Sequence, residues 1–302
     1  MDLNSVLKLI KKPQKIVRYL GNKNFFCWLS DTNYLKLIYR CETGKKLNLD
    51  KPLTFNEKLQ WLKLYDRNPE YCTYVDKFEV RSYIKNTIGE KYLIPLIDVY
   101  DKTIDIPWDT LPDRFVLKCT HGSGCNIICY DKSRLNIEES TVNLNRWMKM
   151  SWYWFGREWP YKNLKSRIVC ETFISDTDKT PDDYKVLCFN GKAKLIEVHI
   201  DRYGNHTQDF YDSEWNKTTI SQGSPTSKFV CDKPPQLKKM IQLSEQLASN
   251  MRHVRIDWFV VQDKLYFGEI TFYDSSGFDL FGNEEDDYLL GSWIDLGGVN
   301  DV

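Results

Sequence analysis

Two acidic residues in the C-terminal part of the chain, Asp257 and Glu269, are spaced so that they could act together. They flank the segment WFVVQDKLYFG, whose β-branched and aromatic residues predict two strands joined by a tight turn. If residues 262–264 form a three-residue loop, Asp257 lies directly opposite Glu269, with the two Cβ atoms about 5 Å apart. Carboxylates at that separation repel each other. A hard divalent cation such as magnesium, held together with the phosphates of a nucleotide, would relieve the repulsion.

The same two strands separate a polar face from an apolar face. The polar face carries Arg255 and Thr271 beside the two acids, and the apolar face carries residues suited to a core: Ile256, Trp258, Val260, Tyr266, Ile270 and Phe272. Two interpretations of the polar face stay open, a metal and phosphate site or an ion cluster in which Arg255 neutralises both acids. A loop with an even number of residues would remove the pairing on which the first interpretation rests.

A lysine interrupts an otherwise apolar strand just before a glycine-containing turn. In the segment FVLKCTHGSG, residues 115–124, Val116 and Lys118 share one face of the predicted strand. A point charge beside exposed backbone N–H groups at Gly122 and Gly124 is an arrangement that binds phosphate. The loop matches neither the Walker A pattern nor GxGxxG, so by itself it is also typical of an ordinary hairpin turn.

Further basic residues could complete such a phosphate site. Lys77 and Arg81 are four residues apart in a predicted helix and would therefore share a face. Lys185 stands at the start of another predicted strand, beside Asp183. Taken alone it is typical of a lysine on a sheet surface. Taken with Lys77, Lys118, Arg255 and the two acids, Lys185 completes a set that could surround a triphosphate and a metal from several sides.

Other kinds of active site find less support. The four histidines lack HExxH or another metal-binding spacing, the nine cysteines form no paired CxxC motif, and no GxSxG marks a serine nucleophile. Asp176 and Asp178 form a DxD pair like the metal and diphosphate motif of nucleotide-sugar glycosyltransferases, in a loop that is equally typical of a solvated connection. The aromatic and basic segment at residues 152–165 suits either stacking against a ligand or packing.

Short helices and strands must position these residues. Thr54 and Glu57 form a capping-box signature, which predicts a helix that starts just after Pro52. Further helices are predicted from Asp76 onward, over residues 138–150 and over residues 235–250. The segment RIVCETFI indicates a buried strand, and the Asn190-Gly191 pair between two strand-like runs predicts a hairpin. The polar loop at residues 176–183 is a plausible subdomain boundary.

The composition is that of a folded protein without a charge bias. Its 302 residues are 42% hydrophobic, and 42 basic residues balance 42 acidic ones, so no global field favours nucleic acid as a partner. No segment reaches the roughly 18 apolar residues that span a bilayer, and no signal-peptide pattern is present. The scattered cysteines indicate a reducing, cytoplasmic location. Basic and apolar residues alternate in residues 1–50, which permits either an ordinary helical cap or contact with an anionic membrane surface.

Taken in order, six segments of the chain resemble the ATP-grasp superfamily. Within it, they are similar to the TupA-like proteins related to teichuronopeptide biosynthesis. The likeness runs from about residue 35 to residue 295, and the ordered set is specific although each motif alone is not. The segments are Asp76-Lys77 with Arg81, FVLK-x-x-HGSG, CETFI, DYKVLCFNGK, RIDW and FGEITFYDSSG.

The resemblance implies an α+β fold of the ATP-grasp type. Two antiparallel-sheet subdomains would hold the nucleotide between them, and an N-terminal helical region would precede them. The expected regions are residues 1–70 for the helical region, 71–110 for a preceding helix and strand subdomain, 111–175 for the lid-type subdomain with the glycine loop, and 176–302 for the C-terminal subdomain with the metal site.

The resemblance also assigns roles residue by residue. Lysines 77 and 118 would contact phosphates, the glycine loop would close over them, and residues 171–174 would meet adenine through their backbone. The nucleotide-binding set is Lys77, Lys118, His121, Gly122, Ser123, Gly124, Glu171, Thr172, Phe173 and Ile174; the metal set is Asp257, Glu269 and Thr271; the catalytic set, near the reacting carboxylate and residues 273–277, is Lys185 and Arg255.

Two departures from the superfamily pattern matter. Thr271 stands where many members have asparagine, which leaves the binding of a second metal in question. The glycine loop also contains fewer glycines than in the carboxylases of the superfamily, which leaves the degree of loop closure in question.

The function that the resemblance implies is an ADP-forming carboxylate-amine ligase that uses ATP and Mg²⁺. It would form an amide on a uronic-acid-type carboxylate through an acyl phosphate, in the synthesis of a surface or capsular polysaccharide. The amine could be an amino acid, and the enzyme would work in the cytoplasm or at the inner face of the membrane. A metal-dependent glycosyltransferase of the same pathway, using Asp176 and Asp178, is the alternative, and a nucleotide-binding regulator without turnover is a third hypothesis. The sequence leaves open which carboxylate and which amine react.

Overall fold

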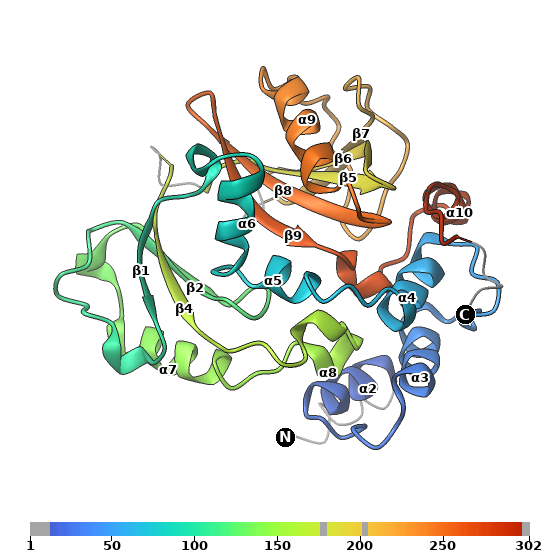
Figure 1. Ribbon diagram of the computed structural model, residues 1–302, viewed down its shortest axis with the longest axis horizontal. Coiled ribbons are helices and arrows are strands. Elements are labelled where there is room, and N and C mark those ends of the chain that lie inside the picture. The colour runs from blue at the N-terminus through green and yellow to red at the C-terminus, as the bar shows by residue number, and fades with distance from the viewer. Residues whose placement is uncertain (1–12, 176–179, 201–204, 298–302) are drawn as a thin grey trace.

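The computed structural model describes residues 13–175, 180–200 and 205–297 of the chain. Asp176 and Asp178 lie outside the described residues, as do the first twelve residues of the segment predicted to permit membrane contact. The N-terminal helices are α2 (Pro13–Asn22), α3 (Asp31–Thr43) and α4 (Phe55–Tyr65). In Figure 1 they lie on the right, with α2 and α3 lowest and α4 above them.

The start of α4 is the capping box that the sequence predicts. The side chain of Thr54 accepts a hydrogen bond from the backbone N–H of Glu57 (3.2 Å), and the carboxylate of Glu57 accepts one from the backbone N–H of Thr54 (3.3 Å). Two donors that the first helical turn would leave unpaired are thereby satisfied. The helix therefore begins where its sequence directs it, against the five-stranded sheet described below.

The helix predicted from Asp76 begins four residues later. Asp76 Oδ1 accepts hydrogen bonds from the backbone N–H groups of Phe78 (2.8 Å) and Glu79 (3.0 Å), so this stretch is a turn between α5 (Tyr71–Val75) and α6 (Val80–Thr87). Side chains of aspartate commonly form such turns at the expense of helix. The prediction that Lys77 and Arg81 share one helix face is therefore wrong, because Lys77 lies in the turn.

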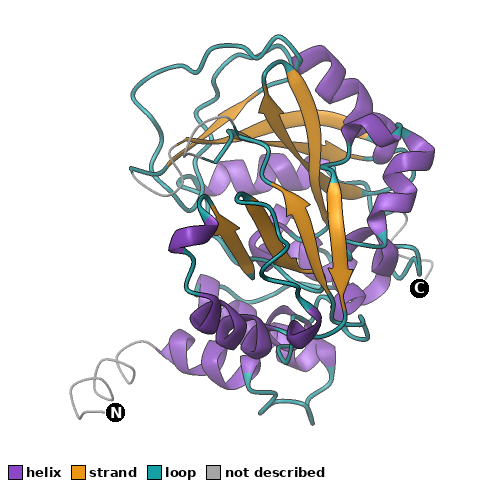
Figure 2. Ribbon diagram, turned by 90° about the vertical axis from the view of Figure 1, so that its left-hand side faces the viewer, coloured by secondary structure: helices purple, strands orange, loops and turns teal. Residues whose placement is uncertain are grey.

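Two antiparallel sheets make up most of the remaining chain, one above the other in Figure 2. The first has the order β1-β4-β2-β3 and contains β1 (Leu96–Tyr100), β2 (Phe115–Cys119), β3 (Asn126–Cys129) and β4 (Ile168–Thr172). The second has the order β7-β6-β5-β8-β9 and contains β5 (Asp183–Phe189), β6 (Lys192–Ile200), β7 (Thr207–Tyr211), β8 (His253–Val261) and β9 (Lys264–Thr271). This mixed arrangement is the predicted α+β class.

The other helices lie at the sheet surfaces and at the two ends, as Figure 1 shows. They are α7 (Ile137–Trp147), α8 (Tyr153–Gly156), α9 (Leu237–Leu247) and α10 (Glu284–Trp293). Short 3-10 turns connect them: η1 (Glu90–Tyr92), η2 (Thr103–Asp105), η3 (Lys132–Arg134), η4 (Trp159–Tyr161) and η5 (Asp274–Gly277). The helices predicted over residues 138–150 and 235–250 correspond to α7 and α9.

Each sheet has its own hydrophobic core. Alternate residues of β2, namely Phe115, Leu117 and Cys119, are buried in the core of the first sheet, whereas Val116 and Lys118 are only partly buried on its other face. The core of the second sheet includes Trp258 and Ile256 on one face of β8, next to α9. The polar side chains of β8 are thereby directed to the opposite face of the sheet.

The Asn190-Gly191 hairpin forms as the sequence predicts. Both residues have positive φ angles, 49° and 77°, and the flanking residues Phe189 and Lys192 face each other across β5 and β6. Positive φ at both central positions is the requirement of a type I′ turn, which Asn-Gly meets at little steric cost.

The buried His253 makes the stability of this core sensitive to acid. It is 2% exposed, with the rings of Phe55 and Phe189 at centroid distances of 5.0 and 4.8 Å. Burial lowers its pKa to about 3. The His253 imidazole takes up a proton near pH 6.5 in the unfolded chain but not in the folded chain. The free energy of unfolding therefore has its full value above pH 6.5 and decreases as the pH falls toward 3.

We therefore predict that replacing His253 by leucine flattens the acid limb of the stability curve. Between pH 6.5 and pH 5 the native protein should lose about 2 kcal/mol more of its free energy of unfolding than His253→Leu, since one pKa unit corresponds to about 1.4 kcal/mol. Urea unfolding at pH 7.5, 6.5 and 5 measures this difference. Parallel curves for the two proteins would contradict the assignment.

Candidate functional site

Asp257 and Glu269 lie close together, but the turn and the strand register that place them there differ from the predicted ones. The loop between β8 and β9 has two residues, Gln262 and Asp263, with φ angles of 47° and 63°, so the prediction of a three-residue loop is wrong. Val261 consequently faces Lys264. That register alone would place Asp257 opposite Gly268 rather than opposite the glutamate.

A bulge in the ladder restores the juxtaposition of the two acids. The register shifts between Ile256 and Trp258, so that beyond the shift Ile256 faces Ile270 and Arg255 faces Thr271. A Cβ on Gly268 would lie 3.1 Å from the carbonyl oxygen of Asp257, so the strands approach closely at this point. A bulge of this kind re-aims a side chain within a sheet.

Arg255 contacts the acidic residues of this face. Its Nε and Nη2 atoms donate to the two oxygens of Asp257 at 2.7 and 2.9 Å, and Nη2 lies 3.5 Å from Oε1 of Glu269. Its Nη1 pairs with Asp274 of η5. A planar guanidinium is suited to several carboxylates at once. The neutralising role that the sequence left open for Arg255 is thus present in the structure.

Neighbouring strands extend the cluster. Lys185 on β5 faces Asp257 in the ladder, and its Nζ lies 2.6 Å from Asp257 and 3.0 Å from Asp183. Glu197 on β6 faces Lys185. Burial raises the pKa of Asp257 and raises that of Asp274 to about 6.

The pKa of Glu269 is shifted in the opposite direction from that of Asp257. Burial opposes its ionisation, but the neighbouring Lys77, Arg255 and Lys185 outweigh this and hold the pKa of its carboxyl well below the ordinary value. The Nζ atom of Lys77 lies 3.0 Å from Oε2 of Glu269. This acid is therefore ionised at neutral pH and able to bind a cation.

The donor set fits a magnesium ion that is shared with phosphates. Within the described part of the cluster, five carboxyl groups accompany three cationic side chains, so this face offers more carboxyl oxygens than its own cations pair with one to one. No three His, Cys, Asp or Glu side chains among the described residues form a metal site by themselves. Magnesium commonly takes only one or two carboxylates and completes its coordination with phosphate and water.

Lys77 connects the acids of the second sheet to the glycine loop of the first. Its Nζ donates to the carbonyl oxygen of Gly122 (2.7 Å) and pairs with Glu269 on β9. Its backbone N–H donates to the carbonyl of Thr120 (3.1 Å). A single side chain in the turn before α6 thus joins two segments that are almost 150 positions apart in the sequence.

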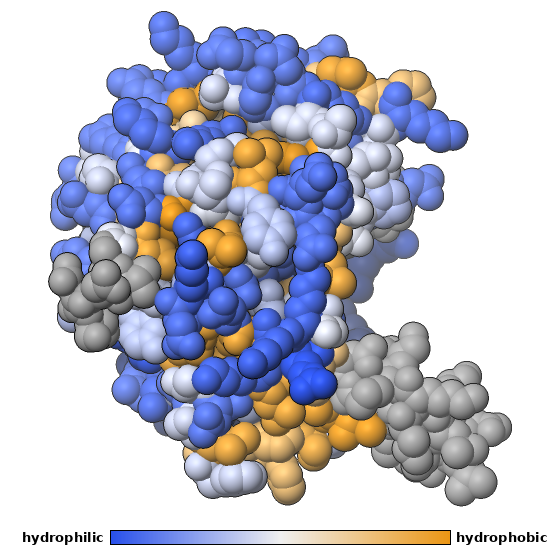
Figure 3. All heavy atoms as spheres, turned by 90° about the vertical axis from the view of Figure 1, so that its right-hand side faces the viewer, coloured by the Kyte–Doolittle hydropathy of each residue, from blue (hydrophilic) through white to orange (hydrophobic). Residues whose placement is uncertain are grey.

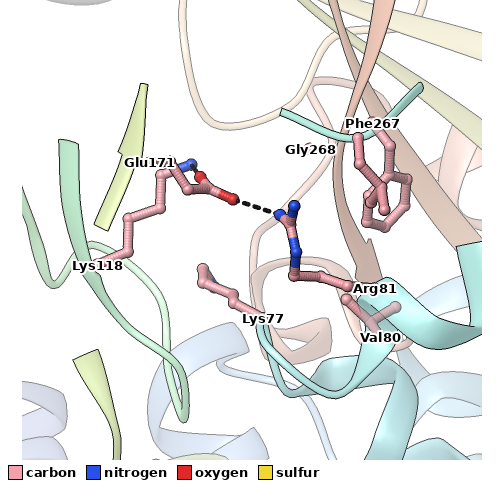
Figure 4. A pocket seen from close by; sticks show the side chains of 8 residues that line it. Lys77, Val80, Arg81, Lys118, Glu171, Phe267 and Gly268 are labelled. Carbon is pink, nitrogen blue, oxygen red and sulfur yellow. Dashed lines mark hydrogen bonds and ion pairs between the residues drawn. The ribbon is translucent and has the colours of Figure 1, made fainter. Parts of the chain in front are cut away.

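A small pocket lies where the two sheets and α6 meet, as Figure 4 shows. Lys118 and Glu171 enter it from the first sheet, and Arg81 enters from α6. The oxygens of Glu171 pair with Lys118 (2.7 Å) and Arg81 (3.0 Å), and the free volume is only about 10 Å³, room for roughly one water molecule. These ion pairs line the pocket and leave little free space in it.

The residues predicted to bind nucleotide do not all gather at this pocket. Lys77, Lys118 and Glu171 line it. Thr172 is exposed, and the Cζ atom of Arg114 lies 4.5 Å from the centre of the Phe173 ring. Glu171 contributes its side chain, which differs from the expected backbone role of that segment. The other predicted members are partly buried or belong to the glycine loop: Ile174, His121, Gly122, Ser123 and Gly124.

The glycine loop is held by contacts with the end of α7 and with the Trp152 ring. His121 is buried, and its Nε2 lies 3.2 Å from the carbonyl oxygen of Trp147 at the end of α7, so its ring does not line the pocket. A Cβ on Gly122 would come within 2.8 Å of the Trp152 ring. Gly124 has a φ of 70°, which favours glycine.

Sequence reasoning missed several residues of this region. Gly268 and Phe267 line the pocket, and Asp274 and Glu197 belong to the acidic cluster. Asp274 could have been predicted, because it lies in the segment FGEITFYDSSG, which resembles the family. Glu197 carried no such signal: counting outward from the Asn190-Gly191 turn places Ile196 opposite Lys185, and only a register shift between Leu187 and Cys188 brings Glu197 there.

A buried lysine from α4 holds the η5 loop in an unusual conformation. Ser275, Ser276 and Gly277 have φ angles of 46°, 57° and 64°. The Nζ of Lys63, which is fully buried, donates to the carbonyl oxygen of Ser276 (2.7 Å), and the Ser276 hydroxyl donates to Glu158 (2.5 Å). Such backbone conformations persist only where surrounding contacts hold them.

The pKa values of this network reflect its burial. Burial lowers the pKa of Lys63 to about 7 and raises the pKa of Glu158. The Lys63 ammonium also lies 4.6 Å from the centre of the Phe278 ring. The loop that carries Asp274 thus depends on a lysine that has almost no contact with water.

We predict that Lys63→Met lowers the free energy of unfolding by about 3 kcal/mol, because it leaves Glu158 buried without its cation. The double variant Lys63→Met/Glu158→Gln should recover most of this loss, since neither charge then remains. Denaturant unfolding of the single and double variants measures the coupling. Additive losses would show that the two side chains do not support each other.

Comparisons with known proteins relate this arrangement to a family. A family model described as TupA-like ATPgrasp matches residues 57–295. Among solved structures, the D-alanine–D-alanine ligase from Helicobacter pylori is similar with a TM-score of 0.46 at 16% identity, covering 80% of this chain and 69% of that one. The comparison with curated proteins gave no match.

Two further solved structures are similar at comparable distance. The D-alanine–D-alanine ligase from Bacillus anthracis has a TM-score of 0.42 at 19% identity, over 66% of this chain and 57% of that one. The L-amino acid ligase from Bacillus licheniformis has a TM-score of 0.43 at 11% identity, over 76% and 51%. The chain therefore spans little more than half the length of these two proteins.

The family match extends over most of the chain and includes the turn with Lys77, the glycine loop and the acidic pair. The predicted family and fold class are thereby confirmed. The chain belongs to the TupA-like ATP-grasp family.

Proposed function

We propose that this protein is an ADP-forming ligase that joins a carboxylate to an amine at the expense of ATP. The observation that carries the proposal is the position of Lys77, which contacts the glycine loop of one sheet and the acid Glu269 of the other. A triphosphate bound between the sheets would meet cations on one side and metal-binding acids on the other. Phosphoryl transfer requires positioning and charge neutralisation more than a side-chain nucleophile.

The roles follow from these positions. Lys77, Lys118 and Arg81 would contact the phosphates, after Lys118 and Arg81 have left Glu171. Asp257 and Glu269 would hold Mg²⁺, which when bound would neutralise charge on the transferred phosphoryl group. Thr271 lies beside them, with its hydroxyl 3.4 Å from Glu269. Arg255 would orient the substrate carboxylate, and Lys185 would keep Asp257 in place.

For the substrates we propose a uronic-acid-type carboxylate and an amino acid, in the synthesis of a surface polysaccharide. The support is the resemblance to proteins related to teichuronopeptide biosynthesis. Contact with the inner membrane surface is part of the same proposal. Trp28 and Phe25 beside α2 are 73% and 58% exposed. Figure 3 shows hydrophobic residues gathered toward the lower end of the face that it draws. No helix among the described residues is long and apolar enough to cross a bilayer.

A co-substrate screen tests the proposed reaction. The protein is incubated with ATP and Mg²⁺, with glucuronate, with a mixture of the twenty common amino acids, and with both together, and ADP release is followed. The ligase requires ADP release that depends on the carboxylate and the amine jointly. Consumption of a sugar nucleotide without ATP would support the glycosyltransferase alternative instead, and ATP binding without phosphate release would support a regulator.

Glu269→Gln should reduce ADP release on the order of 100-fold, because the change removes the ionised metal ligand while keeping its shape. The matched control is Glu284→Gln, which breaks only the exposed ion pair with Lys45. Circular dichroism of the variant should match that of the native protein. Activity retained in Glu269→Gln would remove the metal assignment.

Glu171→Gln should increase the affinity for ADP about fivefold, since about 1 kcal/mol is then no longer needed to free Lys118 and Arg81 from their partner. Lys118→Met should weaken the same binding. Isothermal titration with ADP and Mg²⁺ measures the two effects, and Glu90→Gln, which affects only an exposed pair with Lys85, serves as the control. Weaker binding by Glu171→Gln would mean that its carboxylate itself contacts the nucleotide.

A further inference from the structure

One nitrogen of Arg255 lies among the oxygens of all three residues of the predicted metal set. Its Nη2 atom is 2.9 Å from Oδ2 of Asp257, 3.3 Å from the hydroxyl oxygen of Thr271 and 3.5 Å from Oε1 of Glu269. Each of these distances is within the range of a hydrogen bond or an ion pair. A cationic group of the protein therefore occupies the space between the three oxygens.

Several contacts fix the Arg255 side chain in this position. Its Nε and Nη2 atoms bind the two oxygens of Asp257 at 2.7 and 2.9 Å, and its Nη1 atom pairs with Asp274 of η5. The backbone adds a further constraint, because Arg255 faces Thr271 across β8 and β9. The side chain is only 10% exposed. Moving the guanidinium away would take a cation from two buried carboxylates, which is strongly unfavourable.

The two oxygens of Glu269 face different surroundings. Oε1 lies on the side of Arg255, and the Thr271 hydroxyl donates to it at 3.4 Å. Oε2 pairs instead with Lys77 (3.0 Å), which also contacts Gly122 of the glycine loop and lines the pocket of Figure 4. One oxygen of Glu269 is thus directed toward the predicted phosphate contacts and the other toward a fixed guanidinium.

Lys77 can leave Glu269 more easily than Arg255 can. The lysine contacts the acid through the end of a flexible side chain, whereas the arginine donates from a planar group to two other carboxylates at the same time. A bound phosphate would also give Lys77 a new anion in place of Glu269. We therefore expect Oε2 to become available to a magnesium ion when nucleotide binds, while Oε1 stays beside Arg255.

A second ion at Oε1 would come too close to the guanidinium. Magnesium binds oxygen at about 2.1 Å. The Oε1 atom of Glu269 and the Thr271 hydroxyl oxygen are 3.4 Å apart. An ion bound to both would lie within about 4 Å of Nη2 of Arg255, from whichever side it approached. Positive charges at that separation repel strongly in a nearly buried site, because little water screens them.

We infer that this site binds one magnesium ion, held by Asp257 and Glu269, and that Arg255 takes the place of a second ion. Thr271 is then no metal ligand, and its hydroxyl serves to orient Arg255 and Glu269. The inference rests on the proposed ligase function and deepens it, because it fixes how many metal ions accompany the nucleotide. The fixed charge of an arginine replaces part of the charge that a second ion would supply.

Counting the bound ions tests this inference without any turnover. Manganese(II) suits the same oxygen ligands as magnesium and is readily quantified. Each protein is dialysed to equilibrium against the non-hydrolysable ATP analogue AMP-PNP and an excess of Mn²⁺, and bound analogue and bound manganese are measured. The proteins are the native chain, Arg255→Ala and Thr271→Val. The matched control is Thr110→Val, which removes an exposed hydroxyl that donates to the carbonyl oxygen of Pro107 at 3.2 Å.

The native protein, Thr271→Val and the control should each retain one manganese ion per bound nucleotide. Arg255→Ala should retain two, because loss of the guanidinium opens the space beside Oε1 of Glu269. Circular dichroism shows whether this variant is folded. If it is not, the counts for the native protein and Thr271→Val still decide the question.

Two ions per nucleotide in the native protein would overturn the inference, as would a loss of manganese in Thr271→Val that the control does not share. A folded Arg255→Ala that retains one ion would show that the guanidinium does not take the place of a metal. All three results leave the ligase in place. Nucleotide bound to the native protein without manganese would instead overturn the metal site of the proposed function.

Discussion

The candidate site depends on the contacts between the Arg255 guanidinium and three carboxylates. The guanidinium contacts Asp257, Glu269 and Asp274, which come from two strands and the following loop. Without it, these carboxylates would face one another in a space almost closed to water, at a cost that ordinary packing does not offset. A lysine could not replace it, because only the planar fork donates to several carboxylates in fixed directions.

The charged face is also what relates the two sheets to each other. Each sheet has its own core, so hydrophobic burial alone does not bring their polar faces into register. Lys77 does so by contacting Gly122 and Glu269, and the pairs of Glu171 with Lys118 and Arg81 occupy the pocket between them. Charge-assisted contacts of this kind can exchange one anion for another. Exchange of an anion at these contacts would leave both hydrophobic cores unchanged.

The polar face continues beyond the acidic pair. From Lys185 it passes to Glu197, and hydrogen bonds continue from there through His199 and His206 to Ser224. The opposite face is apolar and packs next to α9, where Trp258 donates to Ser244 (2.8 Å). The alternation of side chains along each strand separates the chemistry from the core.

The sequence by itself determined the features that depend on neighbouring residues. The capping box at Thr54, the Asn190-Gly191 turn, and the division of β2 into a buried face and the face of Lys118 all follow from short-range geometry. The family resemblance gave the order along the chain of the residues proposed to bind phosphate and metal, although it left their side-chain contacts undetermined.

Only the tertiary structure decided the rest. The β8–β9 loop proved one residue shorter than expected, and a bulge beside Gly268 compensated for it, because close packing of the strands sets the register as much as the turn does. The burial of Lys63, the pairing of Glu171 with Lys118 and Arg81, and the alignment of His199 with His206 join residues far apart in the sequence or on different strands. Local patterns cannot specify such contacts, since they arise only when separate elements pack together and buried charges must find partners.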